Sequence, residues 1–241
     1  MITVAYNAER TISDCIESVI AQNFNRVEYI IIDGGSTDKT INIIERYKHH
    51  VSCFVSEPDR GIYDAMNKGI RLATGDVVGM LNADDFFIDN TVLSTIAGAF
   101  DKHDVDIVYA DLDYVNETGR VVRRWRSGEF SRLSLSFGWM PPHPTFYCKR
   151  KLFDQFGFYS LDFGTAGDYE LMLRYLYVNK LKAWYEKKVI INMKIGGKSN
   201  KSITNRVKGL WSDFKAMRHN RILLPAIALI VKPIRKLNQF F

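Results

Sequence analysis

The sequence predicts an α/β fold with a mixed, mostly parallel central sheet and flanking helices. Short runs of β-branched residues alternate with helical patterns through the first hundred residues, which is typical of parallel strands joined by crossover helices. The 241 residues, 46% hydrophobic and 25% charged, suit one globular domain with an appendage. After residue 106 the pattern changes to a hairpin, so we expect the sheet to be mixed.

Four strand and helix units are predicted first. Strands are expected at residues 2–6, 27–32, 51–56 and 77–81, and helices at 11–22, 37–48, 63–73 and 91–103. Ligands of such sheets collect at the carboxyl ends of the strands, so the residues that follow each strand are the first candidates for a site.

The second part of the chain predicts antiparallel strands and one more helix. Residues 107–115 and 121–125 flank a turn and form a hairpin pattern. A proline-rich stretch precedes a strand at 145–148, and a glycine-containing loop at 156–167 precedes a helix at 168–178.

Charge and cysteine content exclude several classes of protein. Residues 198–241 carry ten Lys or Arg and one acid, whereas residues 1–197 carry 23 and 26, so the body is not basic and no nucleic-acid partner is predicted. Three widely spaced cysteines without a CxxC pair indicate neither a disulfide framework nor a thiolate zinc site. The chain starts in an apolar strand without a leader pattern, so a cytoplasmic location is expected.

The C-terminal segment, residues 200–241, is expected to be a basic amphipathic tail. Its apolar run at 222–231 contains Pro225 and is too short to cross a bilayer, which needs about 20 residues. We expect peripheral attachment to anionic lipid on the inner face of the cytoplasmic membrane. A helix packed on the body or a homodimer interface is the alternative. The basic residues that flank the run are Arg218, Arg221, Lys232, Arg235 and Lys236.

Asp33 stands at the tip of the second predicted strand, before two glycines that let a ligand approach the backbone. Its carboxylate could accept hydrogen bonds from a nucleobase or a ribose hydroxyl. The first strand is followed by Tyr6 and Asn7 instead of a GxGxxG phosphate loop, so a Rossmann dehydrogenase is disfavoured.

The connection at residues 56–69 is dense in polar groups, and such loops often carry function. Asp59 and Arg60 could grip a base or a phosphate, and Asn67 with Lys68 follows one helical turn after Asp64. The alternative for each residue is a place on a capped, solvated amphipathic helix.

Asp84 and Asp85 follow the apolar run at 77–81 and predict a site for a hard cation such as Mg²⁺ or Mn²⁺. The alternative is a turn, which also favours Asp and Asn. His143, between prolines, could complete the metal site or bind phosphate, because imidazole suits Mn²⁺, or it could be structural.

In order and spacing, these motifs resemble inverting glycosyltransferases of family 2. The run at 56–69 is similar to that of bacterial polysaccharide-biosynthesis members, including colanic-acid-type transferases. The resemblance is strong over residues 1–90, patchy to about 199 and absent beyond. It implies a GT-A fold over residues 1–199, with a nucleotide-sugar-binding half at 1–110 and an acceptor-binding half at 111–199. The motifs are Thr3-Val4-Ala5-Tyr6-Asn7, Asp33-Gly34-Gly35-Ser36-Thr37-Asp38, Asn67-Lys68-Gly69 with Ala73 and Gly75, and Asn82-Ala83-Asp84-Asp85.

The resemblance also implies roles for the residues that bind the donor. Asp33 resembles the base-contacting acid, and Asn82-Ala83-Asp84 occupies the DXD position, with Asp84 as the ligand of Mn²⁺ or Mg²⁺ and Asp85 as its support. Asn82 replaces the first acid of that motif and could hydrogen-bond a ribose hydroxyl. The further donor contacts expected are Tyr6, Asp59, Arg60, Asn67, Lys68 and Ala83, with Lys198 beside the leaving group.

An inverting transfer needs a base that deprotonates the acceptor hydroxyl. Asp168 is the candidate, because the family presents an acid-Asp pair at this place, although Gly167 replaces the first acid here. Glu170 is the rival, but it should face elsewhere on the helix. An N-cap is the structural alternative for Asp168.

The implied activity is transfer of a sugar from a nucleotide-sugar donor to a hydroxyl of a glycan acceptor in bacterial surface polysaccharide biosynthesis. Family usage favours UDP, and an acceptor linked to lipid such as undecaprenyl diphosphate is expected. A catalytically impaired sugar-nucleotide-binding or scaffold protein is the alternative, because of Asn82 and Gly167. A nucleotidyltransferase is a weaker alternative, since no Gly-rich phosphate loop follows the first strand.

Overall fold

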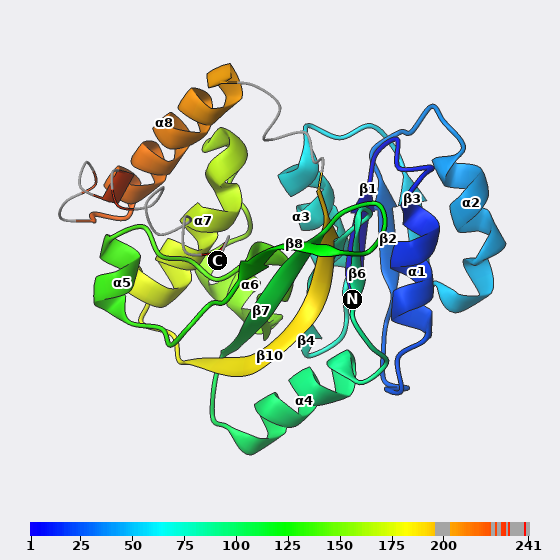
Figure 1. Ribbon diagram of the computed structural model, residues 1–241, viewed down its shortest axis with the longest axis horizontal. Helices are drawn as coiled ribbons and strands as arrows, with labels where there is room; N and C mark the ends of the chain where they lie inside the picture. The colour runs from blue at the N-terminus through cyan, green and yellow to red at the C-terminus, as the bar shows by residue number, and fades with distance from the viewer. Residues whose placement is uncertain (196–202, 223–224, 226–227, 230, 232–238, 240–241) are drawn as a thin grey trace.

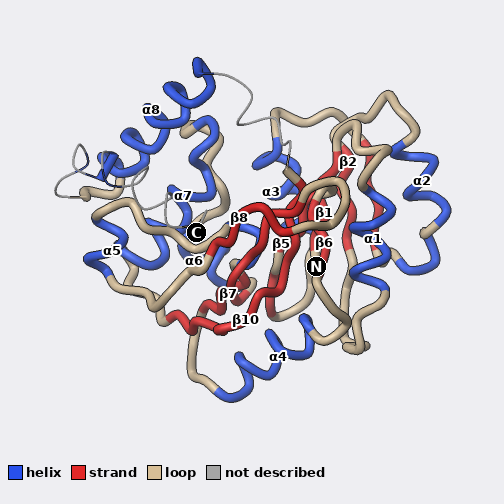
Figure 2. Tube along the Cα trace, in the orientation of Figure 1, coloured by secondary structure: helices blue, strands red, loops and turns tan. Residues whose placement is uncertain are grey.

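The protein has a three-layer α/β architecture in which helices cover both faces of a central sheet region (Figure 1). The computed structural model describes residues 1–195, 203–222, 225, 228–229, 231 and 239. Figure 2 shows the strands running through the middle of the molecule between the two layers of helices.

The first sheet is parallel and has the strand order β3-β2-β1-β5. Its central strands β1 (Ile2–Ala5) and β2 (Ile30–Asp33) are buried at every residue, as expected for strands covered on both faces. The outer strands are β3 (Cys53–Ser56) and β5 (Met80–Asn82). The helices between them are α1 (Ile12–Ile20), α2 (Thr40–Arg46) with the short turn η1 (Lys48–His50), and α3 (Ile62–Leu72).

The second sheet is mixed and has the order β4-β9-β7-β10-β6, with β8 paired to β7. Strand β10 runs parallel to β7 and antiparallel to β6, and the other pairs in this sheet are antiparallel. The strands are β4 (Val77–Val78), β6 (Asp85–Phe87), β7 (Ile107–Val115), β8 (Val121–Trp125), β9 (Tyr147–Lys149) and β10 (Ala183–Lys194).

The remaining helices follow the second sheet along the chain. They are α4 (Val92–Lys102), α5 (Arg132–Ser136), the turn η2 (His143–Thr145), α6 (Lys151–Phe156), the turn η3 (Gly164–Ala166), α7 (Gly167–Met172), its π-helical continuation η4 (Leu173–Val178), and α8 (Ile203–His219). Helix α8 packs on α7 and η3 at the outside of the molecule (Figure 1).

The alternation of side chains along the strands produces two hydrophobic clusters, one on each face. Ile30 and Ile32 belong to the cluster under α3, α6 and α7, whereas Ile31 belongs to the cluster under α1 and α4. Helix α3 lies very close to the sheet, because a Cβ at Gly69 would lie 2.5 Å from Ile2 Cγ2. This close packing fixes where the first turn of α3 stands.

The predicted α/β class and mixed sheet agree with the structure, but the strand expected at 77–81 is in fact two strands. Gly79 separates β4 from β5, and a Cβ there would lie 2.2 Å from Tyr147 Cε1. The chain therefore crosses from the second sheet to the first at this point. The boundary expected at residue 110 falls inside β7, so the two expected halves share the second sheet.

The tail lies partly outside the described residues. Of the apolar run at 222–231, Ile222 and Ala228 are buried with the cluster under α3, α6 and α7. Within the described part of the chain, no helix has the length and apolar character needed to span a bilayer.

Candidate active site

The loops after β1, β2, β3 and β5 meet at one edge of the first sheet, because these strands are parallel. The first two loops are tied together. Asn7 accepts a hydrogen bond from the backbone N–H of Thr37 at 2.9 Å, and the Asn7 N–H donates to Ser36 Oγ at 2.8 Å. Tyr6 beside them is about half exposed, at 52%. Hydrogen bonds thus hold the loops after β1 and β2 together at this edge of the sheet, and the ring of Tyr6 is accessible beside them.

Asp33 is fully buried at the tip of β2 and organises the loop that follows it. Its Oδ2 accepts from the backbone N–H groups of Gly35 at 3.1 Å and Ser36 at 2.9 Å, and from Ser56 Oγ at 2.7 Å. Ser36 Oγ also donates to its Oδ1. The carboxylate therefore joins the ends of β2 and β3 and shapes the wall of the site.

Asp59 lies directly against Gly34, since a Cβ at Gly34 would stand 2.3 Å from Asp59 Oδ2. Its Oδ1 accepts from the Gly61 N–H at 2.8 Å. Lys68 Nζ donates to the Pro58 carbonyl at 2.9 Å and pairs with Glu57 at 2.9 Å, so Lys68 clamps this loop.

Arg60 is directed along the loop, and its side chain is 77% exposed. It pairs with Asp64 at 3.2 Å, and this hydrogen bond with Arg60 is the main cause that holds the pKa of Asp64 below its usual range. An exposed Arg in a weak surface pair is free to turn toward an anionic ligand.

Asn82 to Asp85 connect β5 of the first sheet to β6 of the second, at the junction of the two sheets. Asn82 Nδ2 donates to Asp85 Oδ2 at 3.0 Å. The other side-chain oxygens of these residues, Asn82 Oδ1 and Asp85 Oδ1, are buried and accept no hydrogen bond within the described part of the chain. Orphaned buried oxygens are costly unless a further donor or a cation approaches them.

The raised pKa values of Asp84 and Asp85 also favour a cation at this place. Burial raises the pKa of Asp84, while Lys194 opposes this rise. Burial, and then the charge of Asp84, raise the pKa of Asp85 well above its usual range. A site with two destabilised carboxylates and an orphaned amide oxygen fits a hard divalent cation, which takes oxygen ligands and fills its shell with substrate oxygens.

His143 does not join these acids. The described residues hold no cluster of three or more His, Cys, Asp or Glu able to bind a metal ion. The Nε2 of His143 instead lies 2.9 Å from the hydroxyl of Tyr159. The sequence could not reveal this, because the spacing along the chain does not tell which strand end His143 faces.

Asp168 stands at the start of α7, where its Oδ1 accepts two hydrogen bonds. One comes from the hydroxyl of Tyr63 at 3.0 Å and the other from the Tyr169 N–H at 2.8 Å. None of the described residues donates to its Oδ2. Because Tyr63 is in the first turn of α3, which follows β3, Asp168 lies beside the edge that carries the strand-end residues.

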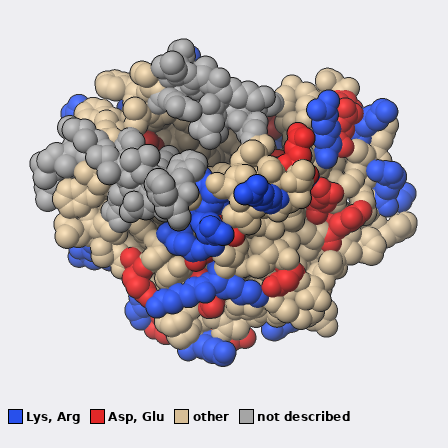
Figure 3. Space-filling model, in the orientation of Figure 1, with Lys and Arg blue, Asp and Glu red and all other residues tan. Residues whose placement is uncertain are grey.

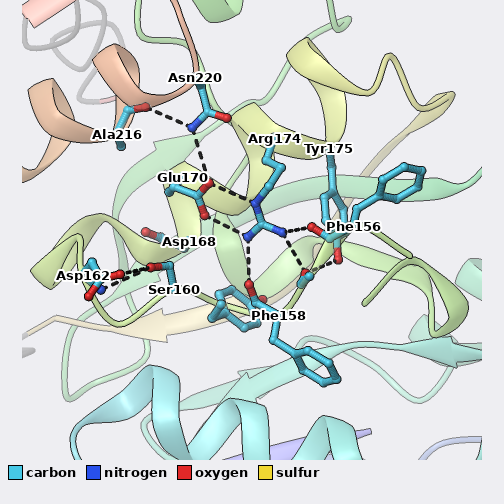
Figure 4. A network of polar contacts seen from close by, with 12 residues as sticks. Phe156, Phe158, Ser160, Asp162, Asp168, Glu170, Arg174, Tyr175, Ala216 and Asn220 are labelled. Atoms are coloured by element: carbon cyan, nitrogen blue, oxygen red, sulfur yellow. Dashed lines mark hydrogen bonds and ion pairs between the residues drawn. The ribbon is translucent and has the colours of Figure 1, made fainter. Parts of the chain in front are cut away.

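Glu170 is the alternative candidate for the base, but both of its carboxylate oxygens accept hydrogen bonds from Arg174. It is 1% exposed and accepts from Arg174 Nε at 3.0 Å and Nη2 at 2.8 Å, as Figure 4 shows. Arg174 also donates to the carbonyls of Phe156, Gly157 and Phe158, so it holds the loop that precedes α7. Asp168 is drawn in the same view and lies outside this ion pair.

Asn67 connects α3 to that same loop, since its amide exchanges two hydrogen bonds with the backbone of Tyr159, at 2.8 and 3.0 Å. Asn67 is therefore buried and bonded to the backbone of this loop, and its amide is not available to contact a nucleotide sugar. Tyr159 stacks on Tyr63 with ring centroids 5.6 Å apart.

The predicted residues thus form two groups. The strand-end group contains Tyr6, Asp33, Asp59, Arg60, Asn82, Ala83, Asp84 and Asp85. The second group contains Asp168, which accepts from Tyr63, and Asn67 and His143, which bond to Tyr159. Lys198 lies outside the described residues. Sequence reasoning missed Tyr63, Lys194 and Arg174, and for Tyr63 the dense polar run at 56–69 was the available signal.

Comparison with known proteins identifies relatives of this chain. A sequence model of the family described as Glycosyl transferase family 2 matches residues 1–165. A PGL/p-HBAD biosynthesis glycosyltransferase of Mycobacterium tuberculosis is 30% identical over 172 residues, which is 70% of this chain and 65% of the relative. Chondroitin synthase of Escherichia coli is 39% identical over 90 residues, or 36% of this chain and 13% of the relative. The chain spans just under two thirds of the mycobacterial relative.

Solved structures show the same fold at low sequence identity. TarS 1–349 of S. aureus in complex with UDP has a TM-score of 0.70 and 21% identity, covering 92% of this chain and 68% of TarS 1–349. The mannosyltransferase PcManGT of Pyrobaculum calidifontis with GDP-Man and Mn²⁺ has a TM-score of 0.68 and 18% identity, covering 96% and 71%. The fold is the GT-A fold of these glycosyltransferases.

Proposed function

This chain belongs to glycosyl transferase family 2, and we propose that it transfers a sugar, with inversion, from a UDP-sugar to a hydroxyl of a glycan acceptor. One observation carries the proposal. Asp168, held through one oxygen, lies beside the edge of the first sheet at which Asp33, Asp59 and the Asn82 to Asp85 segment also stand. A base next to a nucleotide-diphosphate site is the arrangement that a single displacement requires.

In the proposed reaction, the strand-end residues bind the donor. The edge shaped by Asp33 receives the nucleoside, with Tyr6, Asp59 and Arg60 available for contacts to the base or the phosphates. Structures of GT-A neighbours hold UDP, UDP-GlcNAc or GDP-Man, which supports a nucleotide-sugar donor for this chain as well.

A bound divalent cation would neutralise charge on the departing diphosphate. The residues that would hold it are Asp84, with Asn82 and Asp85 adjacent, because Asn82 Oδ1 and Asp85 Oδ1 are buried and have no hydrogen-bond partner among the described residues. Neighbouring structures that contain Mn²⁺ support Mn²⁺ or Mg²⁺.

Asp168 removes the proton from the acceptor hydroxyl as the acceptor oxygen attacks the anomeric carbon. The bond between that carbon and the diphosphate oxygen breaks, and its electron pair leaves with the nucleoside diphosphate. The run at 56–69, which resembles that of bacterial polysaccharide-biosynthesis transferases, supports an acceptor on the route to a surface glycan, linked to a lipid such as undecaprenyl diphosphate.

Helix α8 supports peripheral contact with an anionic membrane. Val207 and Trp211 on its outer face are 60% and 59% exposed, whereas Ala216 and Met217 on the opposite side are buried against the body. Exposed Lys208, Lys215 and Arg218 lie on or beside the outer face. An exposed Trp on a basic helix suits the interface of an anionic bilayer.

Vesicle sedimentation tests this contact. Trp211→Ser should weaken binding to vesicles containing phosphatidylglycerol about tenfold, and Val122→Ser, a change at an exposed site on β8, should not. If the native chain stays in the supernatant at low salt, the membrane contact is disproved. Figure 3 shows Lys and Arg together with Asp and Glu on the described part of the face that it draws.

Release of nucleoside diphosphate from a panel of UDP-, GDP- and dTDP-sugars, with Mn²⁺ or Mg²⁺, tests the proposed function. Asp168→Asn should lower turnover by about 10²- to 10⁴-fold while UDP binding is kept, because Asn retains the oxygen that accepts from Tyr63. Asp101→Asn, at an exposed site on α4, is the matched control. Equal turnover in native protein and Asp168→Asn would disprove the role of Asp168.

A further inference from the structure

Tyr63 reaches from the first turn of α3 to the proposed base. Its hydroxyl lies 3.0 Å from Asp168 Oδ1 and 3.0 Å from the Thr165 carbonyl. Its ring stacks on Tyr159 with an interplanar angle of 18°, and Tyr159 is itself held by Asn67. The Tyr63 side chain is therefore fixed at both its face and its hydroxyl.

Gly167 provides the space for this ring. A Cβ at Gly167 would lie 2.8 Å from both Cδ2 and Cε2 of Tyr63, and 3.1 Å from the Ser160 carbonyl. The backbone of Gly167 is ordinary right-handed helix, at φ −64° and ψ −33°, so its conformation does not require glycine. The requirement is steric, and it comes from Tyr63.

We propose that Tyr63 is the positioning residue for Asp168, and that Gly167 is present to admit it. The inference rests on the proposed function and explains the departure at residue 167, where an acid was expected. An acidic side chain at 167 could not coexist with the ring of Tyr63. In this chain a tyrosine hydroxyl, in place of a neighbouring carboxyl, orients the base.

The hydrogen bonds determine which oxygen reacts. Oδ1 is occupied by the Tyr63 hydroxyl and the Tyr169 N–H, so Oδ2 accepts the proton of the acceptor hydroxyl. That proton transfer accompanies formation of the bond from the acceptor oxygen to the anomeric carbon and loss of the diphosphate with its electron pair. Burial, and then the charge of Asp168, raise the pKa of Tyr63 well above its ordinary value, so its hydroxyl remains a donor.

Steady-state kinetics of Tyr63→Phe tests the inference. Without the hydroxyl, Asp168 can rotate away from its position, and misplacement of a reacting group by about 1 Å can cost 10²-fold in rate. We expect kcat to fall about 10- to 100-fold while the Kd of UDP, measured by calorimetry, stays within about twofold, because the hydroxyl that the change removes is bonded to Asp168 and Thr165.

Gly167→Ala gives an independent test, since the added methyl group should push the ring away without removing the hydroxyl. Its kcat should fall similarly, and the Tyr63→Phe/Gly167→Ala pair should be close to the stronger single change, because both act on one contact. Tyr47→Phe, which removes a hydroxyl bonded to Glu17 on the outer helices, should keep native kcat.

The outcomes separate the two proposals. If Asp168→Asn is inactive and Tyr63→Phe keeps native kcat, Tyr63 is not a positioning residue and the proposed function stands. If Tyr63→Phe loses UDP affinity in parallel with kcat, its role is structural and the inference is overturned. If Asp168→Asn is fully active, the assignment of the base fails, and the inference fails with it.

Discussion

Asn82 donates its side-chain amide to Asp85 Oδ2 at 3.0 Å, at the junction of the two sheets. This contact gives a physical reason for an amide at the position that the family resemblance assigns to the first acid of the DXD motif. A carboxylate at position 82 could not donate to Asp85, and it would add a third negative charge beside two acids whose pKa values burial already raises. The amide keeps one oxygen, Oδ1, which is buried and accepts no hydrogen bond from the described residues.

Asn82→Asp should therefore destabilise the metal-free protein and strengthen its response to metal. Loss of the hydrogen bond and gain of a buried like charge should lower the free energy of unfolding by about 1–3 kcal/mol. Added Mn²⁺ should raise the melting temperature of the variant more than that of the native protein, because three carboxylates then face the cation. Differential scanning fluorimetry with and without MnCl₂ measures both effects.

The exposed change Asn90→Asp is the control for Asn82→Asp. A variant Asn82→Asp with native stability and a native response to Mn²⁺ would show that the segment from Asn82 to Asp85 does not hold the cation.

Gly34→Ala should weaken nucleotide binding without unfolding the protein. The new Cβ would collide with Asp59 Oδ2, and the half-exposed Asp59 side chain can swing outward to avoid it. Loss of one hydrogen bond to a charged group should raise the Kd of UDP about tenfold. Isothermal titration calorimetry measures the change. Gly98→Ala, in α4 with open space around its Cβ, should bind UDP as the native protein does.

Much of the first sheet could be predicted from local patterns. Strand β1 is apolar except for Thr3, and β2 is a run of three isoleucines that ends in Asp33. Helix α1 buries Ile12, Cys15, Ile16 and Val19 at helical spacing, so the hydrophobic period of its sequence agrees with its burial. The hairpin of β7 and β8 was predicted at its observed bounds because its turn is local. The family resemblance and the GT-A fold are confirmed by the comparisons.

Features that depend on distant partners could not be predicted. Strand β10 contains Glu186, Lys187 and Lys188 and pairs with β7 through shifted register, so its sequence shows no clear alternation. Strand β6 begins at Asp85, an acid that the sequence suggested would end a strand. The contact of Tyr63 with Asp168 joins residues 105 positions apart, and no local pattern encodes it.

Arg174→Lys should destabilise the loop before α7 more than an ordinary surface change would. A lysine cannot provide the five donors with which Arg174 binds Glu170 and three backbone carbonyls. We expect the free energy of unfolding to fall by about 2 kcal/mol or more, because buried acceptors lose their partners. Urea denaturation measures this, and Arg150→Lys, in an exposed pair with Asp154, should change it by less than about 0.5 kcal/mol. Equal effects of the two changes would contradict the role given to Arg174.

His143 should make stability fall as the pH drops below about 6.5. Burial lowers the pKa of His143 from its ordinary 6.5, and the charge of Asp168 offsets only part of this effect. The unfolded chain then binds more protons than the folded one between the two pKa values. The free energy of unfolding therefore decreases with falling pH in that window, by at most about 1.4 kcal/mol per pH unit for one proton. Above pH 7.5 this group contributes no slope.

His143→Gln keeps a polar partner for the Tyr159 hydroxyl but does not titrate, so its denaturation curves should show a shallower pH dependence between pH 6.5 and 5 than the native protein. Urea titrations at half-unit pH steps measure the slope. His49→Gln, which removes an exposed imidazole, is the matched control. A slope for His143→Gln equal to the native one would mean that folding does not lower the pKa of His143, against the effect of burial.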